Sequence, residues 1–429
     1  MKLSRFSVAH SLLLGMVALY VFYFSYIPYE DFPEWIYHGH VFNQIVFHHN
    51  DFGGYFWFHP YIPPNASATV VIGLIETLVS PLIAGKLFLF LCCSLIYFGS
   101  FYLLTILAKS KHLMFAFISF SGCFSLYFYM GLMNFIFGLG VALLGACYVF
   151  TRMEKVNVWM MIGFFLVCYC SHFASLLILV VPVLTVLLYT KDKIFLRNIL
   201  LASLPVVALL LHYYFTKEIL TFSSSGILQG SYFETMWGTI IRFPALMMPF
   251  HRVKHVYEPG LFETIINYGF AAILLLATVL FIYRTFAKRE KSPLTITGIL
   301  TLILMAFSPQ YLGGLFNLGE RFVYLFWIVL IAYFFVSFPK PLMRKMYSVF
   351  AICLAIATMS STWYSAQKFN DMDISASAKQ FSGYDPHGGS NPFIHHHFYD
   401  DILQNRGVPI FHHALFDYPG AENSKPFDQ

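Results

Sequence analysis

The residues best suited to chemistry stand in one short stretch, YEDFPEWIYHGH, which follows the first apolar segment of the chain. Pro33 fits the first turn of a helix, and Asp31 precedes it at an N-cap position. Asp31, Glu34 and His38 are spaced i, i+3 and i+7, so a helix places them on one face. A carboxylate that is partly removed from water gains a raised pKa, which suits a general base. The pattern predicts proton transfer by Asp31, with Glu34 and His38 beside it.

The same stretch also has a purely structural interpretation. The Asp31 side chain can cap the helix, and Glu34 can pair with His38 one turn later. Both interpretations stay open at the level of the sequence.

The composition indicates that this stretch belongs to a membrane protein. Hydrophobic residues make up 58% of the chain, charged residues 11%, and the mean hydropathy is +0.67. Soluble domains carry charges on roughly a quarter of their residues. Apolar runs of about 17–22 residues match the thickness of a bilayer. We therefore expect an all-α polytopic membrane protein, and we find no basic tract with interleaved aromatic residues that would bind nucleic acid.

About 11 membrane-spanning helices are expected from the apolar runs. Their approximate ranges are 8–26, 86–108, 113–130, 132–150, 157–171, 173–190, 199–215, 262–283, 294–307, 322–338 and 346–363. The first run lacks a small-x-small cleavage site, so we expect it to be retained as a span.

The loops predict the orientation of the chain. Short basic loops hold 16 of the 26 Lys and Arg residues, which marks them as cytoplasmic and places the N-terminus inside. Long segments at 27–84 and 216–261 then lie outside, as does the tail at 364–429. We expect a multi-pass protein of the inner (plasma) membrane, with a transmembrane domain over 1–363 and an extracytoplasmic C-terminal cap over 364–429.

This orientation depends on residues 67–82, SATVVIGLIETLVSPL. A crossing here would invert every later loop. The segment is short, and Thr69, Gly73, Glu76 and Ser80 recur at helical spacing opposite an apolar face. We therefore expect a helix that lies in the interface within the first extracytoplasmic loop.

Histidine clusters raise the question of a metal. They occupy 38–40, 48–49, 395–397 and 412–413, all on the predicted outer side. Histidine is a common metal ligand, so a divalent metal remains an option. No cluster has a recognised ligand spacing, and we assign neither a metal site nor a cofactor.

Several motifs follow the acidic stretch in order: YIPPN (61–65), AGKLFLF (84–90), GLMNFIFGLGVALL (131–144), SHFASLLILV (171–180) and GERF (319–322). With an acidic residue directly after the first span and a large first outer loop, this arrangement resembles the GT-C superfamily of membrane glycosyltransferases, in an uncharacterised bacterial multispan branch. The resemblance covers about residues 8–340.

The resemblance implies that Asp31 deprotonates an acceptor hydroxyl. It implies a sugar on a polyprenyl phosphate as the donor, reached from among the membrane lipids, and a glycan, lipid or protein as the acceptor. Members often read Asp-x-Pro-x-His, whereas Trp35 stands at the His position here and His38 follows three residues later. This departure leaves the roles of Glu34 and His38 open.

An anionic lipid phosphate needs a fixed cation, and the guanidinium group suits bidentate contact. Arg321 is the best-placed candidate, at the start of a late span; its alternative is snorkelling to the interface or pairing with Glu320. Arg252 and Lys254, in the loop 216–261, are further phosphate-binding candidates, as is Arg242.

Four residues are expected around the substrate cavity: Asn65, Asn134, His172 and Glu320. Asn134 has an alternative role, because Asn among small residues commonly bonds across membrane helices. His172 has the alternative of a buried, hydrogen-bonded side chain.

Two other classes of function remain. The chain could be a multispan transporter or flippase-like protein, or a non-catalytic membrane subunit. Ionisable residues in mid-span mark transport paths, and the expected spans contain almost none, which disfavours ion-coupled transport.

Overall fold

The structure is a computed structural model. It describes residues 5–25, 27, 31–49, 57–58, 62–153, 155–221, 246–251, 258–308, 311–312, 315–316, 318–371 and 416–417.

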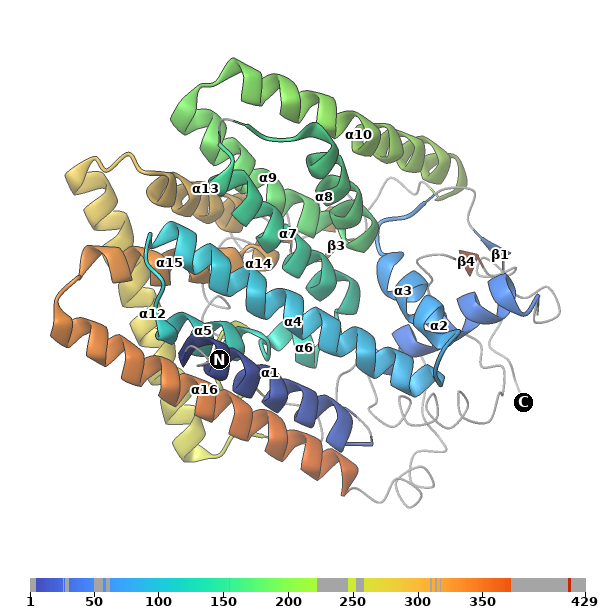
Figure 1. Ribbon diagram of the computed structural model, residues 1–429, viewed down its shortest axis with the longest axis horizontal. Helices are drawn as coiled ribbons and strands as arrows, with labels where there is room; N and C mark the ends of the chain where they lie inside the picture. The colour runs from blue at the N-terminus through green and yellow to red at the C-terminus, as the bar shows by residue number, and fades with distance from the viewer. Residues whose placement is uncertain are drawn as a thin grey trace.

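The described residues are mostly helical, with four two-residue strands (Figure 1). The first half contains α1 (Arg5–Tyr23), α2 (Phe32–Phe47), β1 (Trp57–Phe58), α3 (Ser67–Glu76), α4 (Pro81–Leu107), α5 (Leu113–Gly122), α6 (Leu126–Tyr129), α7 (Met133–Thr151), α8 (Val158–Ser171), α9 (Phe173–Thr190) and α10 (Lys193–Thr221). The second half contains α12 (Leu261–Lys288), α13 (Pro293–Phe307), β2 (Tyr311–Leu312), β3 (Leu315–Phe316), α14 (Leu318–Arg321), α15 (Val323–Ser337), α16 (Pro341–Asn370) and β4 (Phe416–Asp417).

A helix occupies every range in which a span is expected. Seven helices, α1, α4, α7, α9, α10, α12 and α16, are long and apolar enough to cross a membrane, as in a polytopic membrane protein. The remaining apolar helices of the described chain are shorter, with 10–17 residues each, and cross only if the bilayer thins or the helix end is extended. Eleven crossings therefore stay a prediction.

The helices divide into an inner and an outer set. In α7, 83% of the most apolar window is buried, against 22% in each of α1, α10 and α12. α4 packs against α1, α2, α3, α5, α7 and α15, and it lies near the middle of the molecule (Figure 1). The outer helices expose large aliphatic side chains such as Leu12, Leu204 and Ile265, which is the surface that a lipid environment favours.

α2 and α3 form a closely packed pair at one end of the bundle, which we call the α2 end. A Cβ atom at Gly73 would lie 2.7 Å from the Gly39 carbonyl oxygen, so the two backbones nearly touch. The Asn43 amide donates to the Gly73 carbonyl oxygen over 2.9 Å. His40 Nδ1 lies 2.5 Å from a carboxylate oxygen of Glu76, which ties the two helices together.

The helix expected within 67–82 is present as α3, which is too short to span. Its polar side faces the protein, because Thr69 and Gly73 are buried. Leu74 on its apolar side is exposed, as is Leu78 just after the helix end. Both features agree with a helix held against the protein at the membrane interface.

The expected C-terminal cap lies almost entirely outside the described residues. α16 continues to Asn370, past the predicted end of the last span. Further on, β4 pairs antiparallel with β1, with Trp57 opposite Asp417 and Phe58 opposite Phe416. The first loop and the tail therefore meet at the α2 end of the bundle (Figure 1).

Candidate functional site

Asp31 begins α2, as the sequence predicts, but its side chain does not cap the helix. Asp31 is the N-cap residue, its side chain makes no capping hydrogen bond, and its carbonyl oxygen accepts from the Trp35 N–H over 3.3 Å. The side chain is half-buried. Capping of α2 by the Asp31 side chain, the structural alternative to a chemical role, is therefore not observed.

The turn between α6 and α7 holds the backbone of Asp31 in place. Gly131, in this turn, has a φ of +69°, a left-handed conformation that suits glycine. A Cβ atom at Gly131 would lie 2.9 Å from both the Asp31 Cα atom and the Phe32 nitrogen atom. Only glycine allows the turn to approach α2 this closely.

Arg321 ends α14 at the same end of the bundle, and its side chain is half-buried. Its guanidinium carbon lies 4.9 Å from the centroid of the Phe135 ring and 5.9 Å from that of the Tyr127 ring. The Tyr127 hydroxyl donates to the Glu320 carbonyl oxygen over 2.5 Å, which fixes the backbone next to Arg321. Two aromatic rings thus hold a cation in a defined position.

The guanidinium group lies within electrostatic range of Asp31. Burial lowers the pKa of Arg321, while the Tyr127, Glu320 and Asp31 groups raise it. Within the part of the chain that the structure describes, no carboxylate oxygen lies within 4.0 Å of the guanidinium nitrogens, and none of its N–H groups has a hydrogen-bond acceptor. The pairing with Glu320 expected as an alternative is thus not formed, and an anion could be accommodated at this position.

Glu34 is the second carboxyl group of the predicted trio. Burial, and then the negative charge of Asp31, raise the pKa of Glu34 to about 8. Its Oε1 atom lies 3.8 Å from Nε2 of the buried His38, too far for a strong hydrogen bond. Near pH 7 Glu34 is therefore mainly protonated, so it can donate a hydrogen bond.

His172 lies between α8 and α9 and is almost fully buried. Its Nδ1 atom accepts from the Ala174 backbone N–H over 3.1 Å. The imidazole ring makes an edge contact with Phe135, with 5.3 Å between the ring centroids. Burial, followed by the charge of Arg321, lowers the pKa of His172 to about 3, so the ring is neutral.

Asn134 connects α7 to the first loop. Its Oδ1 atom accepts from the Ser67 hydroxyl (2.9 Å) and from the Ala68 N–H (2.6 Å), and its Nδ2 atom donates to the Asn65 carbonyl oxygen (2.7 Å). These bonds provide an acceptor for the Ala68 N–H group at the start of α3, and they agree with the alternative role of Asn134 as a residue that bonds between helices. The Asn65 Oδ1 atom, by contrast, is buried without a hydrogen-bond partner.

The structure brings Asp31, Glu34, His172 and Arg321 to one region, with the backbone of Glu320 at its edge. The phosphate-binding candidates Arg252 and Lys254 lie outside the described residues, as does Arg242. No group of three metal-ligating side chains occurs among the residues described.

Sequence reasoning did not identify Tyr127, Gly131 or Phe135 as residues of this region. All three lie in apolar segments whose residues look alike in a membrane protein, so no local pattern marks them. The strongest available signal was glycine within YMGLMN, at a boundary between two apolar runs.

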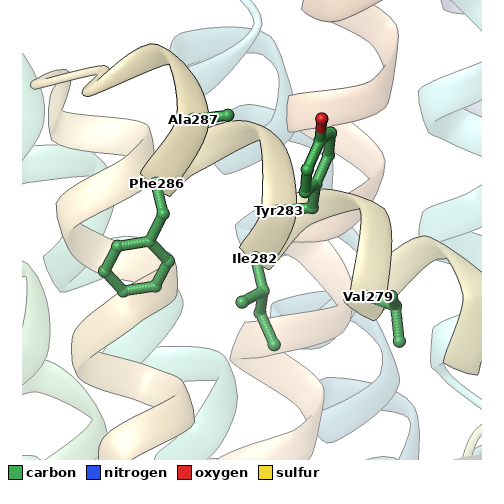
Figure 2. A pocket seen from close by; sticks show the side chains of 5 residues that line it. All are labelled: Val279, Ile282, Tyr283, Phe286 and Ala287. Carbon is green, nitrogen blue, oxygen red and sulfur yellow. The ribbon is translucent and has the colours of Figure 1, made fainter.

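A surface groove on α12 lies outside this region. Its lining comes from α12 alone: Val279, Ile282, Tyr283, Phe286 and Ala287 (Figure 2). The Val279, Tyr283 and Phe286 side chains are 61–69% exposed, and the surface is open and apolar. We interpret it as part of the lipid-facing surface rather than as a substrate site.

Comparison with known proteins found no protein family that matches the chain and no curated protein with significant similarity.

Proposed function

We propose that the protein is a glycosyltransferase that moves a sugar from a polyprenyl-phosphate donor to a hydroxyl acceptor at the α2 end of the bundle, on the extracytoplasmic membrane face. Asp31 takes the proton of the acceptor hydroxyl, and the acceptor oxygen forms a bond to the sugar's anomeric carbon. The bond from that carbon to the donor phosphate oxygen breaks, and the phosphate leaves with the electron pair.

The observation that carries this proposal is the pairing of two unlike groups. Asp31 is a carboxylate that does not cap its helix, and Arg321 is a cation without a carboxylate partner in the described chain. The charge of Asp31 acts on the pKa of Arg321, which supports a shared region. A base and a phosphate-binding cation in one region suit a displacement in which a proton is removed and a phosphate departs.

The decisive variant is Asp31→Asn, which keeps the shape of the side chain and removes the base. We expect the rate of sugar transfer from a labelled polyprenyl-phosphate sugar, measured with protein reconstituted in vesicles, to fall by at least about 100-fold. The matched control is Asp371→Asn, because Asp371 is an exposed carboxylate at the end of α16. Unchanged transfer by Asp31→Asn would remove the catalytic role of Asp31.

Arg321→Gln tests the other half of the proposal. We expect weaker binding of the phosphate-bearing donor, because glutamine keeps hydrogen-bonding capacity but loses the charge. Arg284→Gln is the control, since the Arg284 guanidinium also lies over an aromatic ring, 4.7 Å from the centroid of Phe338. Equal losses in both variants would indicate a general structural effect.

A further inference from the structure

The hydrogen bond at the start of α9 determines which nitrogen atom of His172 carries a proton. Nδ1 accepts from the Ala174 N–H, so it holds a lone pair rather than a hydrogen. In a neutral imidazole the hydrogen must then be on Nε2. His172 thus presents a hydrogen-bond donor on the side of the ring that points away from α9.

This donor lies in the same region as the Arg321 guanidinium. Both side chains contact the Phe135 ring. The His172 and Phe135 rings pack edge to face with 5.3 Å between their centroids, and the guanidinium carbon of Arg321 lies 4.9 Å from the Phe135 centroid. Burial, and then the charge of Arg321, lower the pKa of His172, in agreement with the shared Phe135 contact. Within the described residues, Nε2 makes no hydrogen bond.

We propose that the Nε2–H group of His172 is a second hydrogen-bond donor to the phosphate that Arg321 holds, with Phe135 as the common platform. This inference rests on the proposed function and adds a named contact to it. Arg321 supplies the charge and His172 a directed, uncharged donor. The ligand chemistry is a phosphate oxygen, whether it belongs to a lipid headgroup or to free phosphate.

The surroundings keep this donor neutral. The charged group that acts on the imidazole is Arg321. A second positive charge next to Arg321 would be unfavourable in a site of low polarity. A neutral donor binds the phosphate without that repulsion.

Two substitutions separate this contact from the structural role of His172. His172→Asn keeps an oxygen atom at the position of Nδ1, and asparagine is a good N-cap residue, so α9 retains its cap. It lacks a donor at the position of Nε2. His172→Gln reaches further and places an amide N–H near that position. If His172 has only a structural role, the Asn variant should be the better tolerated of the two. If His172 donates to a phosphate, the Gln variant should be.

The experiment measures binding of a polyprenyl phosphate in phosphatidylcholine vesicles, and separately of inorganic phosphate, to the full-length protein. We expect His172→Asn to weaken binding by about 10- to 100-fold, the range for a hydrogen bond to a charged group, and His172→Gln to restore most of it. Thermal unfolding of both variants controls for folding. Comparing the binding of polyprenyl phosphate with that of inorganic phosphate shows whether the site takes a lipid headgroup or free phosphate.

The outcomes are distinct. Wild-type affinity in His172→Asn together with a loss in Arg321→Gln would overturn the role of His172 and leave the proposed phosphate site intact. Unchanged affinity in both variants would overturn the phosphate site as well. Equal losses in His172→Asn and His172→Gln would assign His172 to structure alone and overturn the donor role.

Discussion

At the scale of single residues, the α2 end of the bundle gives the carboxyl groups of Asp31 and Glu34 different roles. Asp31 and Glu34 are one helical turn apart, and the charge of Asp31 contributes to the raised pKa of Glu34. Burial contributes more, because the Glu34 side chain is only 30% exposed. Pairs of carboxyl groups with different environments commonly divide the roles of base and proton donor. Here Asp31 suits the base, and the protonated Glu34 suits a hydrogen-bond donor.

The raised pKa of Glu34 makes the stability of the protein depend on pH. The folded protein keeps this proton up to about pH 8, whereas the unfolded chain releases it near the ordinary value of 4.5. The folded state therefore binds more protons between these values, and its stability falls as the pH rises through this window. Glu34→Gln stays neutral throughout. We expect this variant to unfold at a higher temperature than the wild type at pH 9, with a smaller difference at pH 5.

Thermal unfolding in detergent at pH 5, 7 and 9 checks this expectation. Glu290→Gln is the control, because Glu290 is exposed in the loop after α12. If Glu34→Gln followed the wild-type pH profile, the carboxyl group of Glu34 would be ionised in the folded protein.

At the scale of elements, turns from distant parts of the chain hold α2 in place. The α6–α7 turn meets the start of α2 through Gly131, and Asn134 at the start of α7 bonds to the start of α3. The end of α8 accepts from the first loop as well, since the Cys170 carbonyl oxygen accepts from the Asn65 and Ala66 N–H groups. The scaffold thus positions the first loop at several points, as a preorganised site requires.

Gly131→Ala tests the most crowded of these contacts. The added methyl group would collide with backbone atoms of Asp31 and Phe32, and the positive φ adds a cost of about 1–2 kcal/mol for a residue with a Cβ atom. We expect lower thermal stability and a larger loss in transfer rate, because Asp31 must move.

Gly163→Ala is the matched control. A Cβ atom at Gly163, within α8, would meet nothing within 4 Å, and alanine favours a helix. We expect unchanged activity and equal or greater stability in this variant. A Gly131→Ala protein with wild-type transfer activity would show that the α6–α7 turn does not position Asp31.

At the scale of the whole molecule, the first loop and the C-terminal tail lie on the same face. The backbone pairing of β1 with β4 requires this, because 57–58 and 416–417 are neighbours. The positive-inside rule predicts that this face is extracytoplasmic. The described α16 runs from its basic first turns, which contain Lys345, to Asn370 on this face.

Cysteine labelling tests the orientation in a Cys353→Ser background, which removes the exposed native thiol. Asp371→Cys should react with a membrane-impermeant maleimide in intact cells, and Lys345→Cys only after permeabilisation; both positions are exposed. The reverse result would place Asp31 and Arg321 on the cytoplasmic face and exclude a donor presented outside.

The sequence by itself determined the helical, membrane-protein character of the chain, the positions of the helices and the place of Asp31 at the start of α2. These features are local: hydropathy, helical spacing and the preference of proline for a first turn act within a few residues. Only the tertiary structure decided that Arg321 lies within electrostatic range of Asp31. It alone also decided that Tyr127 and Phe135 hold Arg321, and that Gly131 packs against the Asp31 backbone. The physical reason is that apolar helix faces pack equally well against lipid or protein, so sequence pattern alone does not specify which of them meet.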